Sequence, residues 1–218
     1  MPINFASLTA SGSTPQDSGT PLATEIRTET GDVSVDLSKG VIVDLGKAEP
    51  GLKKVMFAAQ WDAVESGSPI DVDISALCVN AKGKITSGED VIYFNHRNVN
   101  GISLSEDNQT GAGDGDDETL SIILDQVDRK YHEIIFVANI FEAVKRKQTF
   151  GMVNSCVRLL NMDDNNREIC RFSLKDDCSS ATGVIVGKMT NNNGSWSFTP
   201  IGEGKVVKDL NDILALYS

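Results

Sequence analysis

The residues best suited to chemistry lie in one acidic, glycine-rich segment, residues 106–118, which reads EDNQTGAGDGDDE. This segment holds six carboxylates and three glycines, and it contains no Lys, Arg or His. The carboxylates repel one another, because no cation within the segment balances their charge. We therefore expect a loop that a bound cation holds together. Oxygen ligands without His or Cys are hard donors, which favour calcium over zinc or copper.

A second acidic element lies upstream, where residues 70–80 read IDVDISALCVN. Apolar and polar residues alternate strictly at its start, which predicts a strand with Asp71 and Asp73 on one face. Side chains two apart on a strand lie about 7 Å from each other. The two carboxylates can therefore flank one cation or hold two neighbouring ones, while the acidic loop supplies the remaining oxygens.

Other kinds of acidic or nucleophilic site fit the sequence less well. The loop lacks the DxDxDG start and the flanking helices of an EF-hand. Asp71 and Asp73 also match the aspartyl motif of haloacid-dehalogenase-type phosphotransferases, but those enzymes need a parallel sheet with helical crossovers. His96 and His132 are the only histidines, and nothing in the sequence brings either one beside a nucleophile. We expect no catalytic residue, with phosphotransfer as the third-ranked alternative.

Composition indicates a globular protein without a nucleic-acid partner. The chain has 218 residues, 40% of them hydrophobic, and a formal net charge of −11. This charge repels phosphate-rich surfaces, and the short basic run at residues 145–147 is expected to be a solvated helix end. No leader and no apolar run near the ~20 residues needed to cross a bilayer is present in the sequence, so we expect a cytoplasmic protein. The four cysteines show no CxxC spacing and are expected to be reduced and buried.

The elements that must position the acidic residues are mostly short strands. Residues 1–32 are rich in Ser, Thr, Gly and Pro and are expected to form a flexible or partner-docked arm. From residue 33 to 218 we expect a single all-β domain, a β-sandwich of two mainly antiparallel sheets with a few short helices and a C-terminal helix. The predicted strands cover residues 33–37, 40–45, 53–61, 70–80, 90–94, 119–124, 132–140, 154–160, 168–174, 182–189 and 195–200.

Two local patterns refine this outline. Asn193-Gly194 predicts a hairpin turn between the last two strands. Helix is expected only around residues 141–147 and over the terminal segment 207–217, where apolar residues recur at helical spacing.

Aromatic residues are expected in the core because strand alternation already accounts for them; they are Trp61, Trp196, Phe136, Phe150 and Phe172.

The order of these motifs resembles the TerD family of tellurite-resistance and stress-response proteins over residues 33–217. The most specific parts are the acidic loop, for which the family-like pattern is GDNxTGxGxGDDE, and the strand motif DLDAS, which here reads DVDIS from Asp71. The resemblance implies a calcium-binding β-sandwich with no established catalytic reaction. Glu106, Ala112 and Gln60 depart from the family pattern, which bears on the number and affinity of the ions.

Matched onto this chain, the family pattern implies one or two calcium ions and eight metal ligands. The implied ligands are Asp62, Asp71, Asp73, Asp107, Asn108, Asp116, Asp117 and Glu118.

Two interpretations of function stay open at this point. The first is a non-enzymatic, calcium-dependent scaffold that offers an ordered loop to a protein partner in the stress response. The second is a structural subunit of a larger assembly, such as a virion component, in which residues 1–32 dock on a neighbouring subunit or form a homo-oligomer. Neither interpretation involves nucleic acid or membrane insertion.

Overall fold

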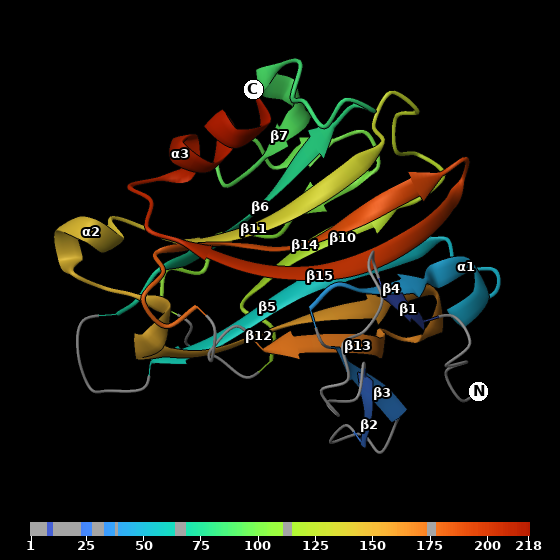
Figure 1. The fold of residues 1–218 in the computed structure, drawn as a ribbon, viewed down its shortest axis with the longest axis horizontal. Helices are drawn as coiled ribbons and strands as arrows, with labels where there is room; N and C mark the ends of the chain where they lie inside the picture. Colours follow the sequence, from blue (N-terminus) through green and yellow to red (C-terminus); the bar gives the residue numbers. More distant parts are fainter. Residues whose placement is uncertain are drawn as a thin grey trace.

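The computed structural model describes residues 8–10, 23–27, 33–37, 39–63, 69–110, 115–173 and 178–218. They form two β-sheets that pack face to face, with three short α-helices outside them (Figure 1). Among the described residues, every strand pair is antiparallel except β3 with β13. The predicted β-sandwich of two mainly antiparallel sheets is therefore confirmed. The parallel sheet that a dehalogenase-type phosphotransferase needs is absent from the part of the chain described here.

The first sheet has seven strands. In spatial order they are β1 (Leu8–Ala10), β4 (Val41–Asp44), β15 (Ser195–Lys205), β14 (Gly183–Asn192), β11 (Glu133–Ile140), β6 (Val72–Val79) and β7 (Val91–Ile92). The second sheet has eight strands. In spatial order they are β2 (Ala23–Arg27), β3 (Val33–Leu37), β13 (Arg167–Ser173), β12 (Val153–Asn161), β5 (Lys54–Ala63), β10 (Glu118–Ile123), β9 (Ile102–Leu104) and β8 (Asn98–Val99).

Helical structure is limited to short pieces. The α-helices are α1 (Leu45–Ala48), α2 (Ala143–Arg146) and α3 (Leu210–Leu214). The 3-10 turns are η2 (Gly88–Asp90), η3 (Phe150–Met152), η4 (Met162–Asp164) and η5 (Ala215–Tyr217). In Figure 1, α1 and α2 lie at opposite ends of the sandwich.

The main core fills the space between the two sheets. Phe57 of β5 stacks on Phe136 of β11, with ring centroids 4.2 Å apart and planes at 6°, a pairing that ties the middle of one sheet to the middle of the other. A second apolar cluster lies on the outer face of the seven-stranded sheet, where Ile213 of α3 packs on residues such as Leu77 and Val137. Strand β6 is therefore buried on both faces. The five aromatic residues predicted for the core are all buried.

Most predicted elements are present, and the differences have local causes. The strand predicted at 40–45 ends at Asp44, because the Asp44 side chain accepts a hydrogen bond from the Lys47 amide at 3.2 Å and caps α1. Strands β8 and β9 were not predicted, since two and three residues are too few for an alternation to register. The predicted hairpin turn is confirmed by left-handed backbone at Asn193 (φ 55°) and Gly194 (φ 95°).

Two short strands, β1 and β2, come from the segment predicted to be an arm. The rest of residues 1–32 lies outside the described residues, as do Leu174 at the end of a predicted strand and residues 111–114 of the acidic loop. Docking of the arm on a partner stays a prediction.

The cysteines are all free, as predicted. Three are buried, but Cys156 is only half-buried, because β12 turns that side chain to the outer face of its sheet. In the described part of the chain, none of the helices has the length and apolar character required to span a membrane.

Candidate metal centre

The two predicted acidic elements meet at the α2 end of the sandwich. Strand β6 starts there just after Asp71, and the acidic loop returns there to begin β10 at Glu118. The backbone N–H of Phe141, at the entrance to α2, donates to the Asp71 carbonyl at 2.8 Å. The Glu118 carboxylate joins the sheets, because its Oε2 accepts from the Ile74 amide of β6 at 2.8 Å.

Three carboxylates converge at this junction. One oxygen each from Asp71, Asp73 and Asp107 lies within 4.8 Å of the other two. Asp73 is buried, Asp71 is half-buried and Asp107 is exposed, so the group opens from the interior towards solvent. Among the described residues, no His or Cys belongs to the group. The predicted alternation thus holds, since Asp71, just before β6, and Asp73, within it, both lie against the acidic loop.

The raised pKa values of these carboxylates reflect their burial and their mutual repulsion, which a bound cation would relieve. Burial, followed by the charges of Asp71 and Asp107, raises the pKa of Asp73 to about 7. Burial likewise raises the pKa of Glu118 to about 8, and the charges of Asp73 and Asp107 add to that effect. Burial and the Asp107 charge raise the pKa of Asp71, although the nearby Arg146 guanidinium opposes them. Metal-free, the site therefore resists full ionisation.

The donors around the group fit a hard divalent cation. Asp71 Oδ1 is buried and accepts no hydrogen bond from any described residue, which is costly for a carboxylate oxygen unless a cation satisfies it. Among the described residues, Asp73 Oδ2 receives one hydrogen bond, from Asn139 Nδ2 at 3.4 Å. Carboxylate oxygens in a partly open, irregular arrangement suit calcium, which accepts six to eight oxygens with flexible geometry.

Asp117 and Asn108 shape the loop instead of joining the three carboxylates. Asp117 Oδ2 accepts from the Trp61 amide at 2.9 Å, and Asp117 Oδ1 accepts from Asn108 Nδ2 at 2.9 Å. Asn108 Oδ1 in turn accepts from the Thr110 amide at 3.1 Å. These bonds dock the loop on β5. Burial raises the pKa of Asp117, and the charges of Asp62 and Asp116 raise it further.

Asp116 has a cationic partner that the loop sequence does not reveal. The Arg158 guanidinium, which comes from β12, donates to Asp116 Oδ1 through Nε at 3.1 Å and also through Nη2. The structure therefore brings together Asp71, Asp73 and Asp107, with Glu118 bonded to the same strand, and it places Asp62, Asp116 and Asp117 outside that group of three. Asp62 itself is exposed at the end of β5.

Sequence reasoning missed Asn139 and Arg158. Asn139 is a buried amide in the otherwise apolar strand β11, directly opposite Asp73 in the β6–β11 register. A polar residue within the apolar run IIFVANI, which follows Glu133, was the available signal. No comparable signal marks Arg158, because its pairing with Asp116 joins residues 42 positions apart.

Comparison with known proteins agrees with this architecture. The TerD domain model matches residues 33–217. Tellurium resistance protein TerD of Serratia marcescens is 41% identical over 176 residues, which cover 79% of this chain and 91% of that protein. General stress protein 16U of Bacillus subtilis is 39% identical over 177 residues, with the same coverage.

Solved structures show the same fold. The crystal structure of a TerD homologue from Streptomyces coelicolor A3(2) superposes with a TM-score of 0.63 at 24% identity, and it covers 77% of this chain and 99% of that one. The family model spans the sandwich from β3 to the C-terminal helical segment, and the match covers 91% of the length of each of these two relatives, which are both above 30% identity. This chain therefore belongs to the TerD family.

Proposed function

We propose that this protein is a non-enzymatic, calcium-binding member of the stress-response and tellurite-resistance family, and that the ion holds the acidic loop against strand β6. The observation that carries the proposal is the convergence of Asp71, Asp73 and Asp107 within 4.8 Å, with one Asp71 oxygen buried and unpaired among the described residues. Without a cation, three carboxylates at this separation repel one another strongly in a partly buried site. A bound divalent ion converts that repulsion into attraction.

Each residue has a separate part in this proposal. Asp71, Asp73 and Asp107 are the ligands, and the Glu118 carboxylate links strand β6 to the loop, because it accepts hydrogen bonds from the Ile74 amide and the Asn108 amide. Asn139 orients Asp73 by its hydrogen bond. Asn108 and Asp117 hold the loop on β5, so that Asp107 is presented to the strand. One or two ions are compatible with this donor set.

A scaffold role is supported by apolar side chains beside the carboxylates. Phe141 and Val144 are 41% and 53% exposed, and the Phe141 amide is bonded to the Asp71 carbonyl. Ordering of Asp71 by calcium would also order this apolar surface, which then suits contact with another protein. The proposal places the protein in the cytoplasm, where its four free cysteines stay reduced.

The test is calorimetric titration of calcium into metal-free protein, with chelator-dependent melting as a second measurement. Asp73→Asn should weaken calcium binding by about 100-fold or more, because it removes a buried anionic ligand. Asp125→Asn, which removes an exposed carboxylate after β10, is the matched control and should bind calcium like the parent. Equal calcium affinity in Asp73→Asn and the parent, or no response of the parent to calcium, would refute the proposal.

A further inference from the structure

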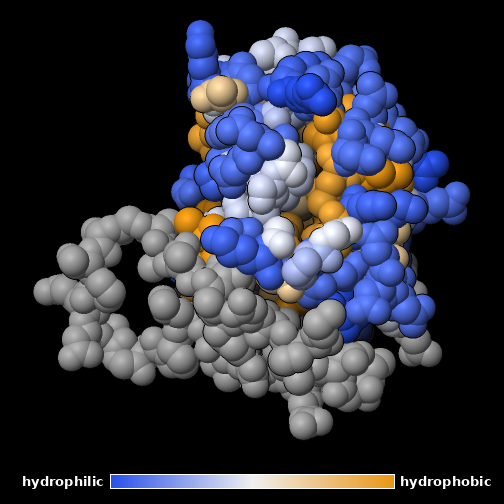
Figure 2. Space-filling model, turned by 90° about the vertical axis from the view of Figure 1, so that its right-hand side faces the viewer, coloured by the Kyte–Doolittle hydropathy of each residue, from blue (hydrophilic) through white to orange (hydrophobic). Residues whose placement is uncertain are grey.

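A cavity of about 720 Å³ lies at the end of the sandwich opposite the three carboxylates. Strand β5 runs from Lys54 near this cavity to Asp62 near the acidic loop, so the length of the sandwich separates the two sites. The cavity forms where the segment after α1, the β10–β11 connection and the β14–β15 hairpin meet. Figure 2 looks onto this end, and it shows apolar surface set between hydrophilic rims.

The floor of the cavity is apolar and firmly packed. Val127, Tyr131 and Trp196 line it and are 6%, 4% and 3% exposed. The Tyr131 hydroxyl donates to buried Asp90 Oδ1 at 2.7 Å, which holds the ring in place. Because these side chains are fixed, the cavity does not need to reorganise to receive a ligand.

The rim of the cavity is cationic, although the chain carries a net charge of −11. Lys53, Arg129 and Lys130 line it, and Asp125 is the one carboxylate among the described lining residues. Lys130 is held by Asp90 at 3.1 Å and lies over the Tyr131 ring. Within the described chain, no carboxylate forms an ion pair with the Lys53 or Arg129 side chain. These donors are therefore available to an anion.

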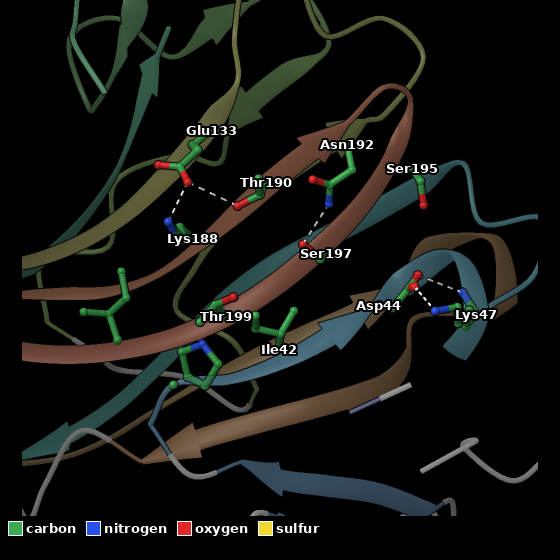
Figure 3. A pocket seen from close by; sticks show the side chains of 13 residues that line it. Ile42, Asp44, Lys47, Glu133, Lys188, Thr190, Asn192, Ser195, Ser197 and Thr199 are labelled. Carbon is green, nitrogen blue, oxygen red and sulfur yellow. Dashed lines mark hydrogen bonds and ion pairs between the residues drawn. The ribbon is translucent and has the colours of Figure 1, made fainter. Parts of the chain in front are cut away.

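A second cavity provides an internal contrast. It measures about 740 Å³ and lies on the outer face of strands β4, β15, β14 and β11 (Figure 3). Its charged residues pair with one another, Asp44 with Lys47 at 2.9 Å and Glu133 with Lys188 at 2.5 Å. Those charges balance within the cavity, so it offers no excess charge to a ligand. In the cationic cavity Asp90 balances Lys130, but the Arg129 side chain has no carboxylate ion-pair partner among the described residues.

We propose that the cationic cavity binds a small organic anion, whose phosphate or carboxylate group meets Arg129 and Lys53 while its apolar part lies against the floor and the half-buried Leu52 and Leu124 beside it. The planar guanidinium of Arg129 can donate two parallel hydrogen bonds to such a group. The apolar floor explains why an organic anion is preferred to an inorganic one, since burial of apolar surface adds to the charge interaction. The site is separate from the acidic group and does not depend on calcium.

The test is a two-dimensional amide NMR titration of the full chain at constant ionic strength, with phenyl phosphate, inorganic phosphate and phenol as probes. We expect phenyl phosphate to shift amides of the β10–β11 connection and the β14–β15 hairpin in a saturable way. Inorganic phosphate and phenol should each bind about tenfold more weakly or worse, because each lacks one half of the interaction.

Two variants separate a built site from general charge effects. Arg129→Gln should raise the Kd of phenyl phosphate about tenfold or more, because it removes a charged hydrogen-bond donor. Lys208→Gln removes the same charge from a residue outside the cavity and should change the Kd less than about twofold. Both sites are exposed, so the spectra of the two variants should otherwise match that of the parent.

Four results would overturn the proposal. Shifts scattered over the surface, or equal effects of Arg129→Gln and Lys208→Gln, would mean that phenyl phosphate only samples the protein's overall charge. Phenol binding as tightly as phenyl phosphate would leave the cationic rim without a role. Inorganic phosphate binding as tightly as phenyl phosphate would mean that the apolar floor contributes nothing to binding.

Discussion

Calcium binding should release protons, in a number that depends steeply on pH. In the metal-free protein the pKa values of Asp73 and Glu118 are about 7 and about 8. At pH 7, Asp73 therefore retains about 0.5 proton and Glu118 about 0.9 proton, and a divalent ion beside them must displace both, about 1.4 protons in all. At pH 9 the same two groups retain together only about 0.1 proton.

Isothermal titration calorimetry measures this number directly. At each pH, calcium is titrated in two buffers of different ionisation enthalpy, and the dependence of the observed heat on that enthalpy gives the protons released. Glu118→Gln is the matched variant, because its amide oxygen can still accept the Ile74 amide hydrogen bond. If the variant retains calcium binding, its release at pH 7 should fall to about 0.5 proton.

Calcium binding with almost no proton release at pH 7 would refute this prediction. A proton release that is the same at pH 7 and pH 9 would refute it as well. Either result would mean that Asp73 and Glu118 are already ionised in the metal-free fold, so that burial and mutual repulsion do not raise their pKa values as described.

Two further predictions concern stability and the acidic loop. Because Asp73 and Glu118 have raised pKa values, the folded protein binds protons more tightly than the unfolded chain does. With a chelator present, the melting temperature should therefore rise as the pH is lowered from about 8 to about 5. Saturating calcium should abolish this rise. A chelated protein whose melting temperature falls over that range would contradict the assignment. Asp116→Asn should lower the free energy of unfolding by about 1 kcal/mol through loss of the Arg158 pair, measured by urea denaturation, while calcium affinity stays within about threefold. A loss of calcium binding as large as that in Asp73→Asn would instead place Asp116 in the metal site.

Much of the fold follows from local sequence. Each of the eleven predicted runs contains a strand, because alternation of apolar and polar residues records which face of a strand is buried. Asn193 and Gly194 predicted their turn, since few other residues adopt left-handed backbone at little cost. The helix predicted at 207–217 begins only at Leu210, where Asp209 accepts from the Asn211 amide and caps it. Caps of this kind depend on backbone geometry, so local composition alone did not place the boundary.

The sequence by itself determined that two acidic segments exist and that Asp71 and Asp73 share one strand face, because spacing along a strand decides the direction of each side chain. Only the tertiary structure decided which carboxylates meet. Asp107 reaches the β6 aspartates, whereas Asp116 is drawn to Arg158 on a strand 42 residues away, and Asn139 faces Asp73 across a register that no local pattern encodes. The same holds for the cationic cavity, whose lining comes from connections far apart in the chain. Such contacts depend on how the sheets stack, which is a property of the whole core and not of any one segment.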